Sequence, residues 1–225
     1  MNKKFNVGIL GGTGFVGQRL VTLLHDHPYF DIRVIAASER SAGNSYSDAV
    51  KAKWKLSQSI PDSVKTMTVK NLHSVDEISS EVDFVFCAVD MPASKVREIE
   101  ESYAKKETPV ISNNSAHRLT PDVPVIIPEV NPGHLAIIEK QKQRLGTSRG
   151  FIAAKPNCSI QSYVPAVNAL MDFKPSVISV CTYQAVSGSG KTFADCPEMI
   201  DNIIPFISGE EEKSEQEPLK VWGRG

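Results

Sequence analysis

Several features that would direct this 225-residue sequence toward particular protein classes are missing. Its 25 basic and 26 acidic side chains leave a net charge of −1, and no stretch is dense in lysine and arginine. A nucleic acid or an anionic membrane surface is therefore not expected as a partner, because both attract concentrated positive charge. No uninterrupted apolar run approaches the roughly 20 residues that span a bilayer.

Cysteine is also sparse. The four cysteines, Cys87, Cys158, Cys181 and Cys196, are widely spaced. No two are close enough to begin a zinc site or a redox CxxC motif, so no metal is expected. The apolar stretch Phe5–Leu10 is too short for the hydrophobic region of a signal peptide. We therefore expect a cytoplasmic protein with free thiols.

Strands alternate with helices along the first two thirds of the chain. Strands are predicted at residues 5–10, 31–37, 83–89, 108–112, 125–127 and 151–154, and helices at 15–25 and 93–106. This order requires crossover connections and a largely parallel sheet, so the predicted fold class is α/β, with a first domain over residues 1–155. A second domain is expected over 156–225, with a helix at 159–171, a β-rich run at 176–186 and an acidic segment at 210–217.

A glycine-rich turn separates the first predicted strand from the first helix. Residues 12–17 satisfy the G-x-G-x-x-G pattern in the strand, turn and helix setting that gives it meaning. Glycines permit the sharp turn and the close approach of a pyrophosphate, whose charge meets the N–H groups at the helix start. We therefore predict a Rossmann-type domain that binds a dinucleotide through Thr13, Gly14, Phe15 and Val16. The alternative is an ordinary glycine-rich turn.

The residues after the second strand bear on which dinucleotide binds. An acidic side chain there holds the ribose hydroxyls of NAD, whereas an arginine accommodates the 2′-phosphate of NADP. The sequence offers Ser38, Glu39, Arg40 and Ser41 at this point. Arg40 and the two serine hydroxyls favour NADP, while Glu39 keeps NAD as the alternative.

Cys158 lies where a predicted strand gives way to a predicted helix, within the sequence Lys-Pro-Asn-Cys-Ser of residues 155–159. A helix N-terminus favours the thiolate, which is the nucleophilic form of cysteine. A thiolate that adds to an aldehyde forms a hemithioacetal, which can pass hydride to a nicotinamide. Beside a dinucleotide turn, we interpret Cys158 as a catalytic nucleophile. Cys87 and Cys181, which fall inside apolar strands, are assigned to the core.

These motifs and several others resemble the aspartate-semialdehyde dehydrogenase family, in the branch found in archaea and fungi. The matching segments occur in order at residues 11–17 (GGTGFVG), 37–43 (ASERSAG), 111–118 (ISNNSAHR), 125–132 (VIIPEVNP), 155–159 (KPNCS), 183–190 (YQAVSGSG) and 209–213 (GEEEK). The resemblance implies reversible reduction of β-aspartyl phosphate by NADPH to aspartate semialdehyde and phosphate, on the path to lysine, methionine and threonine. It also implies a homodimer or homotetramer, with residues 176–186 contributing to the interface.

The same resemblance implies roles for individual residues. Cys158 would form a thioester with the substrate, and Asn157 and Gln184 would orient the substrate around the sulfur. Arg118 and Lys213 would hold phosphate or carboxylate, which suits the donors that an anion needs.

Further roles follow from the resemblance, and one expected part has no match. Glu210 would meet the substrate ammonium, and Gly11, Ser187 and Gly188 would join the cofactor-binding residues.

The family's general-base histidine lies downstream of the GEEEK motif, whereas all five histidines here precede Cys158. Residues 156–225 are therefore expected to form part of an α+β catalytic and dimerisation domain, in a fragment, a truncated product or a short form. Without that base, activity is expected to fall by roughly 10²- to 10⁴-fold.

Other functions stay open at this point. A dinucleotide-binding or oligomerisation fragment without turnover is consistent with the missing histidine, and a malonyl-CoA reductase would use similar chemistry. Residues 185–192 (AVSGSGKT) also approach the P-loop pattern, with alanine in place of its first glycine. A nucleoside triphosphatase would need a later acidic strand for magnesium, and only a short stretch follows these residues.

Overall fold

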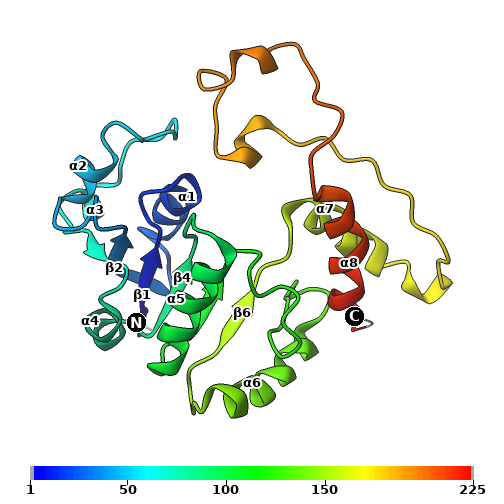
Figure 1. Cartoon of the computed structure of the whole chain (residues 1–225), viewed down its shortest axis with the longest axis horizontal. Coiled ribbons are helices and arrows are strands. Elements are labelled where there is room, and N and C mark those ends of the chain that lie inside the picture. Colours follow the sequence, from blue (N-terminus) through cyan, green and yellow to red (C-terminus); the bar gives the residue numbers. More distant parts are fainter. Residues whose placement is uncertain (1–2, 224–225) are drawn as a thin grey trace. The chain divides into compact units, whose positions relative to one another are not determined.

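A computed structural model of the chain describes residues 3–223 (Figure 1). The chain divides into two compact units. The first unit contains the residues up to Pro124 together with Ala136–Lys155. The second contains Val125–Leu135 together with the residues from Pro156 onward. Each unit is therefore assembled from two separate stretches of sequence.

A six-stranded sheet forms the centre of the first unit. Its strands are β1 (Phe5–Leu10), β2 (Phe30–Ala37), β3 (Lys70–Asn71), β4 (Phe84–Cys87), β5 (Val110–Ser112) and β6 (Ile152–Ala154). They lie in the order β3-β2-β1-β4-β5-β6, and every neighbouring pair is parallel. This is the order of a doubly wound dinucleotide-binding sheet. The predicted α/β class and the Rossmann-type sheet are confirmed.

Helices pack against this sheet and join its strands. They are α1 (Phe15–Leu24), α2 (Tyr46–Val50), α3 (Asp62–Lys65), α4 (Val75–Glu81), α5 (Ala93–Lys105) and α6 (Ile138–Leu145). Four consecutive residues are buried at the end of β1 and again at the end of β2. Because successive side chains point to opposite faces of a strand, both faces of the sheet are covered there. Among residues 3–223, no helix has the length and apolar character that crossing a bilayer would require.

The second unit is organised by two helices, α7 (Cys158–Asn168) and α8 (Glu210–Val221), which lie side by side (Figure 1). Trp222 Nε1 donates to Asn168 Oδ1 at 3.2 Å. Asn131 Nδ2 donates to the carbonyl oxygen of Val221 at 3.0 Å, at the end of α8. Short 3₁₀ turns complete the chain, at η1 (Pro132–Ile137), η2 (Met171–Phe173), η3 (Val186–Ser189) and η4 (Pro197–Met199).

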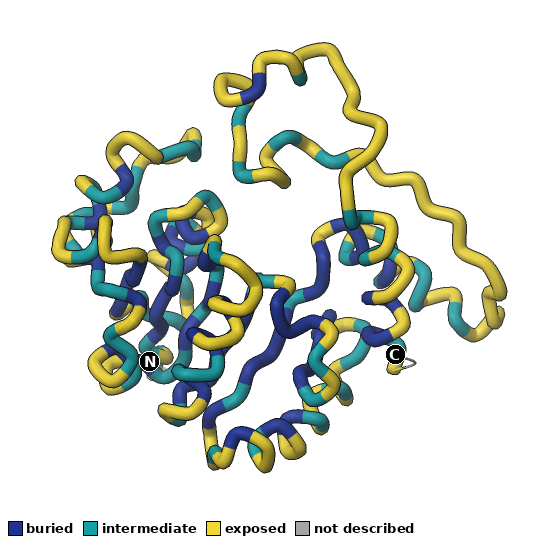
Figure 2. The backbone as a smooth tube through the Cα atoms, viewed as in Figure 1, coloured by how far each residue is buried: buried dark blue, intermediate teal, exposed yellow. Residues whose placement is uncertain are grey.

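Two predicted strands are wrong. Residues 125–127 contain only a single bridging residue, Val125, and residues 176–186 form no strand within the described part of the chain. The latter run is exposed over nearly its whole length (Figure 2). A β-rich sequence becomes a strand only where a neighbouring strand pairs with it, and the described second unit offers none. Cys181 is therefore exposed rather than in the core, whereas Cys87 is buried as predicted.

We expect the substitution Gly17→Ala to destabilise the first unit by about 1–3 kcal/mol, through overpacking. A Cβ at this position would lie 2.1 Å from the carbonyl oxygen of Gly11, so the turn or α1 would have to move. Urea unfolding measures the loss. Gly14→Ala is the matched control, because its Cβ would lie 3.4 Å from the same oxygen. That control is expected to lose less than about 0.5 kcal/mol, because the poorer N-cap preference of alanine is offset by its smaller conformational entropy in the unfolded chain; equal losses in the two variants would contradict this account of the turn.

Candidate functional site

The carboxyl ends of the central strands bring the predicted cofactor residues to one edge of the sheet. The amides of Gly11 and Gly12, which follow β1, donate to the carbonyl oxygen of Ala36 in β2 at 2.8 and 3.1 Å. On the other side, a Cβ on Gly11 would lie 2.4 Å from the carbonyl oxygen of Ala88, which follows β4. The turn therefore lies between β2 and β4, where the strand order reverses and where such sheets bind ligands.

The glycine turn leads directly into α1. Gly11 has a φ of 82°, and Gly14 is the N-cap residue of α1 without a side-chain hydrogen bond to the helix. The described first turn of α1 carries no acidic side chain. Its first N–H groups have no acceptor within the helix, so this end suits an anion such as a pyrophosphate. Among the other predicted residues, Thr13 and Phe15 are half-buried, and Gly14 and Val16 are exposed.

The loop predicted to select between dinucleotides follows β2 at the same edge. Ser38, Glu39 and Arg40 are exposed, and Ser41 is buried. The amide of Ser41 donates to the carbonyl oxygen of Ser38 at 2.9 Å and closes the turn. Both Arg40 and Glu39 are thus on an exposed loop next to the glycine turn. The geometry of this unit is compatible with either dinucleotide.

Arg118 belongs to the first unit and lies in the loop that follows β5. Only 8% of its surface is exposed. Its Nε donates to the carbonyl oxygen of Lys155 at 2.9 Å, and its Nη2 donates to that of Asn113 at 3.2 Å. The amide of Asn113 donates in turn to the carbonyl oxygen of Cys87 at 2.8 Å. The guanidinium therefore links the backbone that follows β5 to the backbone that follows β6.

In the second unit, Cys158 lies at the start of a helix, as the sequence predicts, and it is exposed; α7 begins at Cys158 itself and ends at Asn168, whereas the prediction is 159–171. Asn157 is the N-cap residue, and its Oδ1 accepts a hydrogen bond from the amide of Ser159 at 2.9 Å. The amide of Asn157 itself donates to Glu217 Oε2 on α8, at 2.6 Å. A side-chain cap and a buried carboxylate thus fix the backbone on both sides of the thiol.

The carboxylate of Glu210 accepts hydrogen bonds from four side chains near Cys158. Lys213 Nζ lies 2.7 Å from Oε1, and Gln184 Nε2 lies 2.7 Å from Oε2. Ser159 Oγ donates to Oε2 at 3.0 Å, and Asn157 Nδ2 lies 3.2 Å from the same oxygen. Gln184 also donates to Ser159 Oγ at 2.8 Å. The structure therefore brings Asn157, Gln184, Glu210 and Lys213 together beside Cys158.

The charge of this cluster follows from its hydrogen bonds. Partial burial opposes ionisation of Glu210, but hydrogen bonds from Lys213, Gln184, Ser159 and Asn157 outweigh it and lower its pKa from 4.5 to about 2. Glu210 is therefore a carboxylate at neutral pH. Such a group can recognise an ammonium ion, and the adjacent Lys213 can recognise an anion.

Ser159 and Glu217 contribute to the site but were not singled out from the sequence. Ser159 adjoins Cys158 in the KPNCS motif, so its position was a usable signal. Glu217 lies seven residues after Glu210, a spacing that places both on one face of a helix. The sequence predicts residues 210–217 only as an acidic segment, whereas they form most of α8. A helix over these residues is the signal that points to Glu217.

Residues 185–192 do not form a phosphate-binding loop of the P-loop kind. Ser187 and Gly188 lie in the exposed turn η3. Within the described residues, no strand leads into this segment and no α-helix starts directly after it. A P-loop requires both elements. The proposed cofactor contact of Ser187 and Gly188 stays a prediction.

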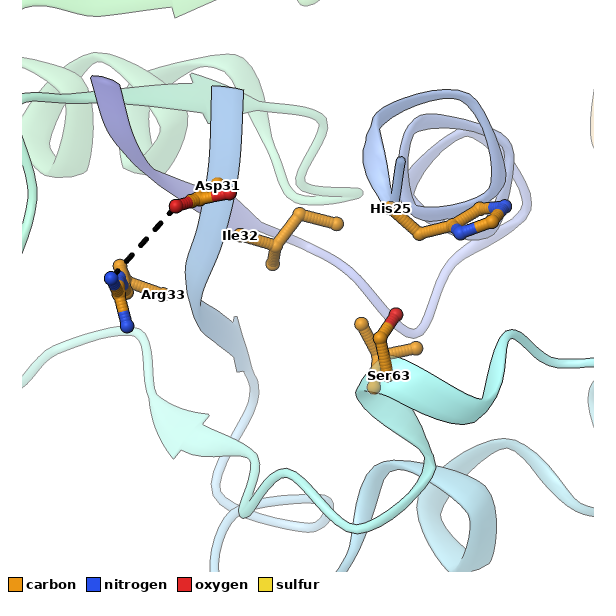
Figure 3. Close-up of a pocket in the computed structure, with 6 residues that line it drawn as sticks. His25, Asp31, Ile32, Arg33 and Ser63 are labelled. Carbon is orange, nitrogen blue, oxygen red and sulfur yellow. Dashed lines mark ion pairs between the residues drawn. The ribbon is translucent and has the colours of Figure 1, made fainter. Parts of the chain in front are cut away.

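A polar cavity of about 260 Å³ lies elsewhere in the first unit (Figure 3). Asp31, Ile32 and Arg33 line it from the amino-terminal half of β2, together with His25, Ser63 and Val64. Arg33 Nη2 and Asp31 Oδ2 form an ion pair at 3.9 Å. Because the cavity lies near the amino ends of the strands, it is separate from the edge that carries the glycine turn.

Comparisons with known proteins agree with this geometry. Residues 6–138 match the family model described as "Semialdehyde dehydrogenase, NAD binding domain". An aspartate-semialdehyde dehydrogenase of Archaeoglobus fulgidus is 41% identical over 98% of this chain and 62% of its own length. One from Schizosaccharomyces pombe is 43% identical over 96% of this chain and 60% of its own length.

A solved structure gives the same relationship. The aspartate-semialdehyde dehydrogenase of Candida albicans with NADP superimposes with a TM-score of 0.81 at 36% identity, over 97% of this chain and 60% of that one. The chain therefore spans about 60% of the length of these relatives.

We expect Glu210→Gln to lower the free energy of unfolding at pH 7 by about 1–3 kcal/mol, because charge-assisted hydrogen bonds are replaced by weaker ones. The pKa of Glu210 is lower in the folded protein, so its contribution is complete above about pH 4.5 and is lost as the pH falls toward about 2. Urea unfolding across this range should show the two proteins converging at low pH. Glu211→Gln, at an exposed neighbour in the same helical turn, should change little. A constant difference at all pH values would contradict the assignment.

Proposed function

The chain belongs to the semialdehyde dehydrogenase family, and on that premise we propose that it catalyses the reversible, NADP-dependent conversion of β-aspartyl phosphate to aspartate semialdehyde and phosphate. One observation carries the proposal. An exposed thiol stands at the first residue of α7, beside a carboxylate that is held ionised by Lys213, Gln184, Ser159 and Asn157. The names of the Archaeoglobus, Schizosaccharomyces and Candida relatives support the same reaction.

Cys158 is the nucleophile of this reaction. Its sulfur attacks the acyl carbon of β-aspartyl phosphate, a carbon–sulfur bond forms, and the carbon–oxygen bond to phosphate breaks. The dinucleotide, when bound, supplies the hydride that reduces the acyl group to the aldehyde. Breaking the carbon–sulfur bond then returns the thiolate. Asn157 and Gln184, held by Glu210 and Ser159, orient the substrate beside the sulfur.

The charged residues recognise the two ends of the substrate. The Glu210 carboxylate meets the ammonium group, since an opposite charge is the strongest partner in a partly buried site. Lys213 and Arg118 meet carboxylate or phosphate. Arg118 already donates to two backbone carbonyl oxygens, and these contacts hold its planar fork in a fixed orientation.

The first unit holds the cofactor. The tight glycines, the uncapped start of α1 and the absence of acidic side chains from its described first turn all suit a pyrophosphate. Arg40, with Ser38 and Ser41, holds the 2′-phosphate of NADP. The Candida structure, whose name includes NADP, supports this choice over NAD.

Exposed apolar side chains on the second unit favour self-association of the chain. Phe173, Val177 and Tyr183 are each more than 80% exposed, on a segment that is exposed over most of its length (Figure 2). Exposed apolar surface of this extent is typical of an interaction surface. A homodimer or homotetramer would cover this surface.

The state of the cysteines bears on the compartment. All four cysteines are free, which suits the reducing cytoplasm.

We expect Gly14→Ala to weaken NADP binding by about tenfold or more while leaving the urea midpoint nearly unchanged, because this backbone must approach the pyrophosphate closely. Isothermal titration calorimetry of both proteins provides the dissociation constants. Gly133→Ala is the control, since a Cβ there would meet nothing within 4 Å. Equal NADP affinity in the Gly14 variant and the wild type would place the dinucleotide elsewhere.

We expect Cys158→Ala to abolish reduction of NADP in a mixture of protein, NADP, aspartate semialdehyde and phosphate or arsenate, followed by the absorbance of the reduced nicotinamide. Cys181→Ala, which removes another exposed thiol, should leave the rate unchanged. Intact-mass analysis after addition of β-aspartyl phosphate should detect an aspartyl adduct on the wild type and on the Cys181 variant only. Turnover or acylation that survives Cys158→Ala would overturn the proposed mechanism.

A further inference from the structure

A buried polar cluster in the first unit has no part in the chemistry above. Glu100, on α5, is completely buried, and His117 is 2% exposed. Ser112 Oγ donates to Glu100 Oε1 at 2.5 Å, and Asn114 Nδ2 donates to the same oxygen at 3.0 Å. Asn114 Nδ2 also lies 3.4 Å from Cys87 Sγ. Glu100 Oε1 thus accepts hydrogen bonds from the end of β5 and from the loop that follows it.

The other oxygen of Glu100 and one nitrogen of His117 are unsatisfied. Among the described residues, Glu100 Oε2 and His117 Nε2 are buried and have no hydrogen-bond partner. They lie 4.0 Å apart. Two bare acceptors facing each other in a buried site would be unfavourable. A proton on one of them turns the pair into donor and acceptor, and a displacement of about 1 Å brings the two atoms within hydrogen-bond distance.

The surroundings indicate where this proton lies. Burial raises the pKa of Glu100 and lowers the pKa of His117, so both groups favour their uncharged forms. His117 Nδ1 lies 3.1 Å from Thr120 Oγ1, a hydroxyl that can accept its proton. Nε2 is then the acceptor. Of the groups that act on His117, the charge of Glu101 and the backbone of Arg97 favour a charged ring, whereas burial and the charges of Arg97 and Arg144 oppose it and prevail.

We propose that Glu100 and His117 share one proton as an uncharged hydrogen-bonded pair, which positions the loop of residues 112–118. The pair holds this loop at both ends, through Ser112 and Asn114 at its start and through His117 near its end. Arg118 directly follows His117, so the inference rests on the proposed function for the anion-binding role of Arg118. Glu100 and His117 are therefore positioning residues, which act through Arg118 rather than on the substrate.

Nuclear magnetic resonance of ¹⁵N-labelled imidazole tests the proton's place. In the wild type, His117 is expected to show one protonated and one bare ring nitrogen, unchanged between about pH 5 and 8, where an ordinary histidine titrates. Glu100→Gln should keep this pattern, because the amide N–H donates to the same nitrogen. A doubly protonated His117 at pH 7, or a ring that titrates normally, would overturn the proposal.

Amide hydrogen exchange on the same proteins tests the positioning role. Glu100→Leu should accelerate exchange of the Asn113 and Arg118 amides by about tenfold or more relative to that of Val85 in β4, since the loop loses its buried partners. Glu100→Gln should restore wild-type rates. Equal behaviour of the two variants would overturn the proposal, and if Glu100→Leu does not fold, wild-type-like rates and ring signals in Glu100→Gln still decide it. No substrate or cofactor is used, so failure here is distinct from failure of the proposed reaction.

Discussion

Parallel pairing of β1 with both β2 and β4 is the constraint on which the rest of the first unit depends. In register with its two neighbours, β1 ends where β2 and β4 end, and the chain must then turn within the space between them. Only residues without a side chain fit at Gly11 and Gly12, because a Cβ there would meet Ala88 or Ile35 at 2.4 Å. The same tight turn places the start of α1 at the carboxyl ends of the strands. A requirement of packing thus places a helix start that suits an anion at the carboxyl ends of the strands.

In the second unit, two carboxylates on α8 perform related tasks for α7. Glu217 accepts a hydrogen bond from the amide of Asn157, and Glu210 accepts hydrogen bonds from the side chains of Asn157 and Ser159. Both carboxylates come from one face of α8, so the packing of the two helices sets the backbone on either side of Cys158. We propose this thiol as the nucleophile, and a backbone held in this way needs little reorganisation when a substrate arrives. The helix that carries the acidic motif is therefore as much a part of the site as the helix that carries the thiol.

The two polar clusters of the protein differ in how they satisfy a buried carboxyl group. Glu210 is partly exposed and accepts hydrogen bonds from a lysine, two amides and a hydroxyl, so it is stable as an anion. Glu100 is fully buried, and the donors around it are neutral, so its uncharged form is favoured. Burial and the charge of the donors decide between these outcomes. The sequence places Glu100 in a predicted helix and Glu210 in an acidic segment, and neither stretch shows which carboxyl group is ionised.

The sequence by itself determined the features that depend on a few neighbouring residues. The alternation of strands and helices, the glycine turn after β1 and the helix start at Cys158 all follow from local backbone sterics and periodicity, and the structure confirms them. Only the tertiary structure decided that residues 176–186 remain unpaired and that Cys181 is exposed, because a strand needs a partner that the sequence does not specify. It likewise decided the roles of Glu217, Ser159 and the Glu100–His117 pair. These depend on contacts between residues that are distant in the chain or in separate elements, and such contacts arise from how whole helices and strands pack.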